Sequence, residues 1–529
     1  MSGDGVQPVR LACLQCKQRK KGCDKELPSC GPCVLKGIAC SYQKQKQKQK
    51  QSQQPPPKNA LPPKNALPPK HAPPPKSAQP LKNAAVAHTA AARSPKRIRL
   101  QHVASPAARE VSTSSPVFVI PADVASANGN LYSHVNGIIR STGQFVDDVT
   151  ARYFQGVHRF VPVVSRARFQ QNITPGAAPP ADFSVLLLAV CLMTYDPILD
   201  GGPGAIDRHY ILVSARSLFA QLQAVSSPSI NLIQAGLLLA LYEYANGQPD
   251  RAFASIANCA RMAYSAGFHK FHQQDADDLA ADVDAEEAAN TWWAIVICER
   301  AILCEVAVSD QPLVTIFPDE TSQLPTEPET DQSDTLVDSI TPVSLSSPFM
   351  VAVGGFRRTA QVASLLNKVL DATRKPVLKE QLVHLESLNS ILQSLLTIVT
   401  QQRQGKLGDF GGAAAMAIRS LFILHCHILE LTPTDIANTK YKTPEVWFES
   451  SRSALDAITK MTLDIVNSHQ GMSAHLSDTL PLNYMYMIQA ALRHLENNSS
   501  EDSTGWRLDA ELRLRNSLAP LSRRWGVGA

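Results

Sequence analysis

The 529-residue sequence has no long hydrophobic run. Its best candidate, Val185 to Met193, has nine residues, half of the ~18 that a membrane-spanning helix needs. The opening segment, MSGDGVQPVR, lacks the apolar core of a secretory signal, which argues against export and against a disulfide framework. We therefore expect a soluble, intracellular protein with no membrane partner.

The sequence also lacks the short motifs that position catalytic groups. It has no nucleophile elbow, no His-Glu-x-x-His pair and no glycine-rich loop that would hold a phosphate. Five scattered cysteines lie among Leu, Ile, Val and Ala, where a free cysteine packs as a small hydrophobe. They are Cys191, Cys259, Cys298, Cys304 and Cys426. We predict core packing for these five and conclude that the protein is not an enzyme.

Acidic residues are scarce in the first part of the chain. Residues 1–110 hold 21 Lys/Arg and 4 Asp/Glu, a formal charge of +17, whereas the remainder holds 30 and 42, a charge of −12. The overall charge of +5 hides this asymmetry. A basic N-terminal segment on an acidic body indicates nucleic-acid binding at the N-terminal end.

Six of the 11 cysteines fall into two similar halves of this basic segment. Each half has a C-x-x-C pair and, after six intervening residues, a third cysteine. The pair can hold one tetrahedral zinc ion from a tight turn. The six are Cys13, Cys16, Cys23, Cys30, Cys33 and Cys40. Two four-coordinate zinc ions need eight ligand positions, which six thiolates fill when two of them bridge both metals. One zinc ion with four cysteines would leave two thiols unexplained.

Basic residues occupy the interval between the second and third of these cysteines, which is the length of a short helix. They are Lys17, Arg19, Lys20 and Lys21. They would help neutralise six thiolates that bind two Zn²⁺, and they would project donors towards phosphates and base edges. A domain this small has almost no apolar core, so metal binding would supply most of its folding free energy, on the order of 10 kcal/mol per site.

This spacing resembles that of the fungal binuclear zinc-cluster (C6) transcription factors. The resemblance implies a small domain of two short helix-loop halves over residues 1–42, with Cys13 and Cys30 as the bridging thiolates. It also implies that the helix after Cys16 enters the major groove of double-stranded DNA, typically over a CGG triplet. Lys20 matches the family's principal base-reading lysine, and Lys17 and Arg19 also match basic positions of the family.

The match has one departure: Gly22 stands where a Lys or Arg usually precedes the third cysteine. The alternative to DNA binding is a zinc-dependent protein-interaction module whose lysines are only solvated. A second basic cluster, formed by Lys96, Arg97 and Arg99, is a candidate nuclear import signal, and we expect the protein to act in the nucleus.

Residues 43–110 alternate Gln and Lys and then repeat Lys every six residues among prolines. Such a segment cannot bury enough apolar surface to order itself, so we predict a disordered linker with polyproline II character. It contains no sustained heptads, so dimerisation through a coiled coil next to the zinc cluster is not expected. Binding of a single triplet as a monomer and pairing as a homodimer through the rest of the chain both remain open.

From about residue 144 the pattern becomes helical, with long apolar-periodic segments. We predict a large all-α domain over 144–320, a flexible loop over 321–355 and a helical continuation over 356–529. The predicted helices are 231–244, 253–266, 286–306, 382–400, 411–431, 446–466 and 480–495, with helix ends at Gly247 and Gly267.

Three stretches of this domain, within 144–320, resemble the fungal transcription-factor regulatory (middle homology) domain. They begin at Tyr153, at Gln234 and at Glu286. Their candidate functional residues are His158, Met262, His269, Trp292 and Trp293, for which we favour core packing over an effector pocket.

The resemblance implies a domain that restrains or transmits activation. The whole sequence therefore predicts a DNA-binding regulator of RNA polymerase II transcription, most simply an activator of one pathway or gene cluster, whose partners are DNA and the transcription machinery or co-regulators.

Overall fold

The computed structural model describes residues 124–174, 178–197, 200, 206–273, 283–327, 343–402, 410–468, 480–497 and 505–527. The chain divides into two units, Met1–Arg109 and Glu110–Ala529, and all of the described residues belong to the second. The predicted zinc domain 1–42 and linker 43–110 lie outside the described residues.

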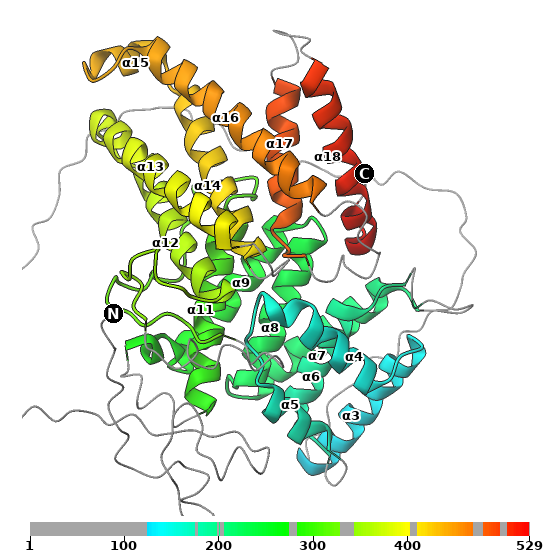
Figure 1. The fold of residues 1–529 in the computed structure, drawn as a ribbon. Coiled ribbons are helices and arrows are strands. Elements are labelled where there is room, and N and C mark those ends of the chain that lie inside the picture. Colours follow the sequence, from blue (N-terminus) through cyan, green and yellow to red (C-terminus); the bar gives the residue numbers. More distant parts are fainter. Residues whose placement is uncertain are drawn as a thin grey trace, which may run out of the picture. The chain divides into compact units, whose positions relative to one another are not determined.

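The described part of the second unit is helical (Figure 1). Its α-helices are α3 (Val124–Ser141), α4 (Val146–Gln155), α5 (Arg166–Ile173), α6 (Ala181–Thr194), α7 (Arg208–Val225), α8 (Ile230–Ala245), α9 (Pro249–Ser265), α11 (Val283–Leu303), α12 (Gly355–Thr373), α13 (Leu378–Gln402), α14 (Gly411–Glu430), α15 (Pro433–Asn438), α16 (Pro444–Asn467), α17 (Tyr484–Asn497) and α18 (Gly505–Trp525). Two 3₁₀ helices, η1 (Val157–Arg159) and η2 (Phe268–Gln273), and an isolated bridge between Gln323 and Ser344 complete the described elements. The all-α prediction is confirmed.

Local sequence signals explain where several helices begin and end. At the start of α8, the Ser229 hydroxyl accepts a hydrogen bond from the Leu232 N–H at 3.2 Å. Proline opens α9, α15 and α16, where its missing N–H would be unpaired in any case. Gly247 and Gly267 follow α8 and α9 with φ of 72° and 82°, the left-handed conformation that glycine adopts without strain. Both predicted helix ends are correct.

The centre of this unit is formed by α6, α8, α9 and α11. Helix α6 is buried from Phe183 to Thr194 and α8 from Leu232 to Ala245. Helix α8 packs against α6, α7, α9 and α11. A Cβ at Gly236 would lie 2.8 Å from the Cys259 Sγ and 2.9 Å from the Phe219 ring, so glycine is what lets these helices approach so closely.

The C-terminal helices extend this core. Helix α14 packs against α12, α13, α16 and α17, while α18 packs against α16 and α17 (Figure 1). Tyr486 of α17 stacks on Tyr244 of α8, with ring centroids 4.2 Å apart. Its hydroxyl also donates a hydrogen bond to the Tyr244 carbonyl at 2.6 Å. Helices α8 and α17, far apart in the sequence, therefore share one core within the helical unit.

All seven helices predicted by range are present, with ends shifted by a few residues. The predicted segment 231–244 corresponds to α8, and 411–431 corresponds to α14. Helix α12 begins at Gly355, next to the predicted restart at Phe356. Sequence reasoning did not name α3 to α7, α15 or α18 as helices, and α3 lies before the boundary predicted at 144.

The segment predicted as a flexible loop, 321–355, is described in two pieces, and residues 328–342 lie outside the described residues. The described pieces are irregular, apart from the bridge between Gln323 and Ser344. Leu324, Val343 and Leu345 are buried in the core. The two ends of this loop are thus held against the helices by apolar contacts.

Two described helices, α13 and α14, are long and apolar enough to cross a membrane by length and composition alone. Within α14, 72% of the apolar window is buried inside the helical unit, as in the core helix of a folded domain.

The scattered cysteines differ in their environments. Cys191, Cys259 and Cys298 are buried, and Cys304 is partly buried. Cys426 is exposed, so the core-packing prediction is wrong for that residue. His425 and Ile428 occupy the buried face of α14, whereas Cys426 lies on the outward face of the same helix.

Candidate functional site

The metal-binding, DNA-binding and nuclear-import candidates of the sequence analysis all lie outside the described residues. These are Cys13, Cys16, Cys23, Cys30, Cys33 and Cys40, then Lys17, Arg19, Lys20 and Lys21, and finally Lys96, Arg97 and Arg99. The donor set itself suits zinc, because thiolates in paired C-x-x-C spacing are typical ligands of tetrahedral zinc. Within the part that the structure describes, no group of three or more His, Cys, Asp or Glu side chains is placed to hold a metal ion.

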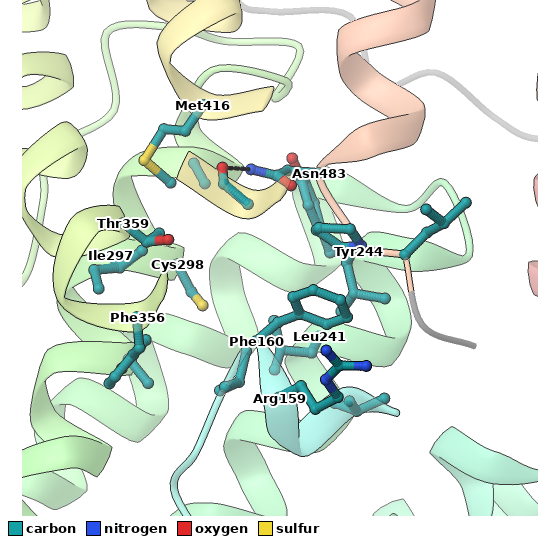
Figure 2. Close-up of a pocket in the computed structure, with 18 of the residues that line it drawn as sticks. Arg159, Phe160, Leu241, Tyr244, Ile297, Cys298, Phe356, Thr359, Met416 and Asn483 are labelled. Carbon is teal, nitrogen blue, oxygen red and sulfur yellow. Dashed lines mark hydrogen bonds between the residues drawn. The ribbon is translucent and has the colours of Figure 1, made fainter. Parts of the chain in front are cut away.

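The helical unit contains a pocket between its earlier helices, α8 and α11, and its later helices, α12, α14 and α18 (Figure 2). Its empty volume is about 830 Å³, open mouth included. The lining comes from η1 and the segment after it, from α8, α11, α12 and α14, from residues 480–483 and from α18. Its apolar wall includes Phe160, Leu241, Ile297, Phe356, Met416 and Trp525.

Few polar side chains reach this pocket. Figure 2 shows Arg159 at one end and Asn483 at the other, with Thr359 and Cys298 on the wall between them. The Asn483 Nδ2 donates a hydrogen bond to the Gly412 carbonyl at 3.1 Å. Burial raises the pKa of the Cys298 thiol to about 12, so this thiol stays protonated and unreactive at neutral pH.

The aromatic residues of the first resembling stretch pack together beside η1. The His158 ring lies 4.8 Å from the Phe154 ring and 5.8 Å from the Tyr153 ring, centroid to centroid. Burial, and then the charge of Arg166, lowers the pKa of His158 to about 3. His158 is therefore neutral in the core at physiological pH, which agrees with the core-packing interpretation.

The tryptophan pair of α11 is also part of the core. Trp292 and Trp293 are each 1% exposed. Trp292 packs edge-on against Tyr264, with centroids 4.9 Å apart, and His269 packs on the same tyrosine ring at 4.9 Å. The Trp293 Nε1 donates a hydrogen bond to the Gln323 carbonyl at 3.1 Å, which fixes the described start of the 321–355 loop. Met262 is likewise buried.

Sequence reasoning missed the buried carboxylates of α11. Glu299 is fully buried and accepts hydrogen bonds from the backbone N–H groups of Val314 at 2.7 Å and Thr315 at 3.0 Å. It also pairs with Arg300, whose Nη1 lies 2.9 Å from a Glu299 oxygen. Near the start of the same helix, Glu287 accepts a hydrogen bond from the Ser165 N–H at 3.0 Å. An acidic residue inside an apolar helical run was the available signal, since such a group needs partners.

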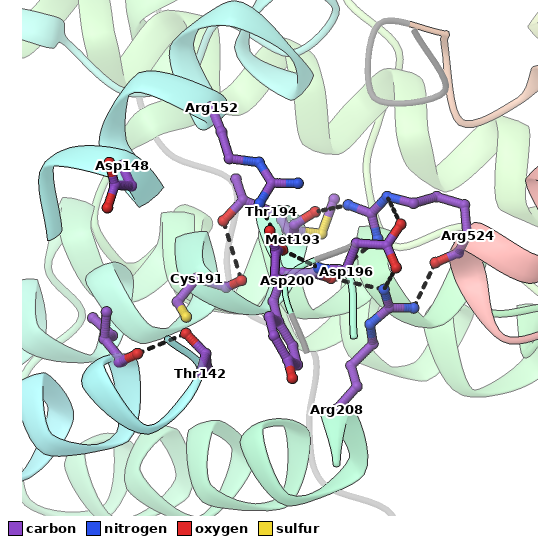
Figure 3. Close-up of polar contacts among 12 residues, drawn as sticks. Thr142, Asp148, Arg152, Cys191, Met193, Thr194, Asp196, Asp200, Arg208 and Arg524 are labelled. Atoms are coloured by element: carbon purple, nitrogen blue, oxygen red, sulfur yellow. Dashed lines mark hydrogen bonds and ion pairs between the residues drawn. The ribbon is translucent and has the colours of Figure 1, made fainter. Parts of the chain in front are cut away.

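A second buried polar cluster links the first and last parts of the helical unit (Figure 3). Arg208, at the start of α7, donates from Nη2 to the Tyr195 carbonyl at 2.7 Å. Arg524, near the end of α18, donates from Nη2 to the Met193 carbonyl at 2.9 Å and from Nη1 to the Tyr195 carbonyl at 3.2 Å. The Asp196 carboxylate lies 4.0 Å from the first guanidinium and 3.9 Å from the second.

These two arginines meet the C-terminal end of α6, where the helix leaves its last carbonyls without intrahelical partners. The negative end of the helix dipole favours cations at this place. Burial lowers the pKa of Arg208, and the charge of Arg524 lowers it further, whereas Tyr242 and then Asp196 raise it. The cluster is a structural clamp that joins α18 to α6 and α7.

Comparison with known proteins identifies both parts of the chain. The family described as fungal specific transcription factor domain matches residues 150–456, and the fungal Zn(2)-Cys(6) binuclear cluster domain matches residues 11–49. The chain is 26% identical over 139 residues to Transcription factor BOA15 of Botryotinia fuckeliana (strain B05.10), a stretch that covers 26% of this chain and 74% of that protein. No solved structure matches the chain.

The family match spans more than half of the chain, so the protein belongs to the fungal-specific transcription factors. It is a fungal transcription regulator, and these families are not families of enzymes. The matched N-terminal domain is one that binds two zinc ions through six cysteines. The match of the regulatory domain continues past residue 320, into α16.

Proposed function

We propose that this protein binds DNA sequence-specifically and regulates RNA polymerase II transcription by reading CGG-like triplets in the major groove. The observation that carries the proposal is the position of four basic residues inside the cysteine frame, between Cys16 and Cys23. A metal cluster would hold such a segment rigidly, so that its donors reach bases as well as phosphates. Lys20 is the residue to which we assign the principal base contact.

The same proposal assigns the metal ligands. All six cysteines between Cys13 and Cys40 bind zinc, and Cys13 and Cys30 bridge the two ions. The ligand count supports this assignment, because six thiolates complete two tetrahedral sites when two of them are shared. Replacing Cys30 by Ser should release metal from both sites, which metal analysis of the purified full chain can measure.

We further propose that the protein acts in the nucleus, as an activator of one pathway or gene cluster, together with co-regulators or the transcription machinery. The basic cluster of Lys96, Arg97 and Arg99 is the proposed import signal. Replacing all three by Ala in a fluorescent fusion should move the protein to the cytoplasm. The same change at Lys58, Lys64 and Lys70 of the linker is the control, and nuclear retention of the first variant would contradict the assignment.

The protein either binds one triplet as a monomer or pairs as a homodimer through the helical unit. The linker offers no heptad pattern for a coiled coil. Sedimentation of the full chain with a duplex that carries one or two triplets distinguishes the two arrangements.

The DNA-reading proposal is tested by Lys20→Ala in the full chain, with Lys36→Ala as a control between the last two cysteines. Loss of a base contact should weaken binding to a CGG-bearing duplex by about 1–3 kcal/mol and reduce discrimination against a mutated triplet. The zinc content and the control should be unchanged. Equal binding of all three proteins to both duplexes would favour the alternative, a zinc-dependent protein-interaction module without DNA readout.

A further inference from the structure

The outward side of helix α13 is more exposed than its apolar composition predicts. Helix α13 packs against α12 and α14 and lies along the outside of the described helices (Figure 1). Of its apolar window 39% is buried, against 72% for the window of α14. Val383 and Ile391 are 42% and 36% exposed. A helix this apolar is normally covered by neighbours, so its outward side calls for a partner.

Six residues at helical spacing define this side, which we call the α13 face. At 1.5 Å per residue the row is about 22 Å long, and steps of three or four residues keep it on one side of the helix. No Asp, Glu, Lys or Arg occurs from Ser387 to Gln402. The six residues are Val383, Ser387, Ser390, Ile391, Ser394 and Ile398.

Two of the serines bond to their own helix. The Ser390 Oγ donates a hydrogen bond to the Glu386 carbonyl at 3.2 Å, and the Ser394 Oγ donates to the Ser390 carbonyl at 2.9 Å. Because these hydroxyl protons are engaged, covering the two serines with another helix leaves neither donor unpaired. Their small side chains also let the axis of a second helix come close.

The α13 face is complementary to itself in an antiparallel pair. A twofold axis that passes between Ser390 and Ile391 brings each residue opposite one of similar or fitting size in a second copy. The facing pairs are Val383 with Ile398, Ser387 with Ser394, and Ser390 with Ile391. A surface that matches itself about a twofold axis is what an isologous dimer requires.

The distribution of charge favours the same partner. In this register Glu380, in the charged first turn of α13, faces the uncharged Gln401 of the second copy. After residue 110 the chain carries 30 Lys/Arg and 42 Asp/Glu, a charge of −12, so two copies repel each other least across a face without charges. We propose that the α13 face is a homodimer interface, on which α13 of a second copy packs antiparallel.

The expected strength follows from the size of the contact. One pair of helices of this length is at the low end of protein interfaces, so we expect a dissociation constant on the order of micromolar. A duplex with two triplets would hold two copies together and strengthen the pairing. The inference names the surface for the homodimer arrangement of the proposed function and rests on that arrangement.

The first test is sedimentation equilibrium of the full zinc-loaded chain without DNA, from about 0.1 μM to about 100 μM. Ile391→Glu brings two carboxylates together beside the twofold axis and should weaken dimerisation at least ten-fold. The matched control is Leu512→Glu, at an exposed leucine of α18, which should dimerise like wild type. Circular dichroism of both variants should confirm that the helical unit is folded.

A complementary pair of variants tests the register. Ser390→Lys alone should also weaken dimerisation, whereas an equal mixture of Ser390→Lys and Ile391→Glu should recover it. Recovery is expected because each lysine then faces a glutamate of the other variant. It would also show that the loss in Ile391→Glu alone is not a folding defect.

Disulfide cross-linking measures the position of the axis. Under mild oxidation, Ser390→Cys should form a covalent dimer, because this position lies beside its own copy. Val383→Cys should not, since its two copies lie about 22 Å apart along the pair. Val383→Cys mixed with Ile398→Cys should cross-link. Wild type, in which Cys426 is exposed, gives the background.

Binding of each protein to a duplex with one CGG triplet is measured alongside, so that this interface and the DNA-reading proposal are judged separately. A chain that binds this duplex but stays monomeric over the whole concentration range leaves the α13 face to another partner and overturns the proposal. Equal dimerisation of Ile391→Glu and Leu512→Glu, or equal cross-linking of Val383→Cys and Ser390→Cys, would also overturn it.

Discussion

The guanidinium of Arg208 donates a hydrogen bond from Nη1 to the main-chain carbonyl of Arg524, at 2.5 Å, across 316 positions of the sequence. Both side chains are buried, and both also donate to carbonyls at the end of α6. The α18 helix is thus fastened to the first helices of the regulatory unit by polar contacts that solvent does not reach. Since α18 lies beyond the family match at 150–456, this fastening joins a C-terminal segment of this chain to the family domain.

Arg524→Ala tests the clamp. It leaves the Met193 carbonyl without its donor and the Asp196 carboxylate with one cation fewer, so we expect the free energy of unfolding to fall by about 3 kcal/mol. Urea unfolding followed by tryptophan fluorescence measures the change. The matched control is Arg523→Ala, the exposed neighbour on the same helix, which should have little effect. Equal destabilisation by the two variants would show that the buried contacts of Arg524 do not stabilise the helical unit more than an exposed arginine does.

The turn after α8 faces the turn after α18. Gly247 has φ of 72°, and a Cβ there would lie 3.1 Å from the Val527 Cγ1. Gly247→Ala should therefore lower the free energy of unfolding by more than about 1 kcal/mol, through both strain and crowding. Gly137→Ala, on an exposed helical site with open space around its Cβ, should raise it by about 0.5–1 kcal/mol. Chemical denaturation of both variants checks the opposite signs.

His158 makes stability depend on pH. Its pKa falls from 6.5 in the unfolded chain to about 3 in the folded one, because burial and Arg166 oppose its charge. Above pH 6.5 the residue is neutral in both the folded and the unfolded state, and its contribution to the free energy of unfolding is fully present. As pH falls towards 3, only the unfolded state takes up the proton, so the free energy of unfolding decreases by up to about 1.4 kcal/mol per pH unit.

Replacing His158 by Phe should remove this part of the slope, since phenylalanine keeps the ring contacts but does not titrate. Unfolding curves at several values between about pH 5 and pH 7 give the slopes of wild type and variant. His384→Phe, at an exposed histidine of α13, is the control and should leave the slope in place. Burial lowers the pKa of His425 to about 4. This residue therefore also makes the free energy of unfolding fall as pH falls, and it does so equally in wild type and in both variants. An unchanged slope in the His158 variant would mean that this ring is protonated in the core.

The sequence predicted helices correctly where the apolar periodicity and the residues that end a helix lie within one short segment. Helix α8 ends where Gly247 predicts, because the left-handed turn is a property of that residue. Helix α6 was seen only as a short apolar run, since a helix buried on all sides shows no 3.6-residue polar pattern. Helix α18 was missed because it is largely polar and contains Pro520, which removes a backbone donor within the helix.

The pocket and the clamp could not be predicted, for a different reason. Both bring together residues from segments that only the tertiary fold makes neighbours, such as Arg159 with Asn483 and Arg208 with Arg524. Neither pair has a spacing motif, so no local pattern marks it. The six-cysteine pattern is the opposite case, because its ligands and basic residues lie within one short stretch. That stretch carries the proposed DNA-binding site and lies outside the described residues.

The central claim, that a two-zinc cluster reads DNA, is tested most directly by selecting binding sites from random duplex DNA with the full chain while measuring zinc in the same sample. The account predicts two zinc ions per chain, enrichment of a CGG-like triplet and loss of that enrichment after chelation with EDTA. The helical signal in circular dichroism should persist, because no metal-binding group lies among the described residues of the helical unit. One zinc ion per chain, or no enriched sequence in the zinc-loaded sample, would contradict the account.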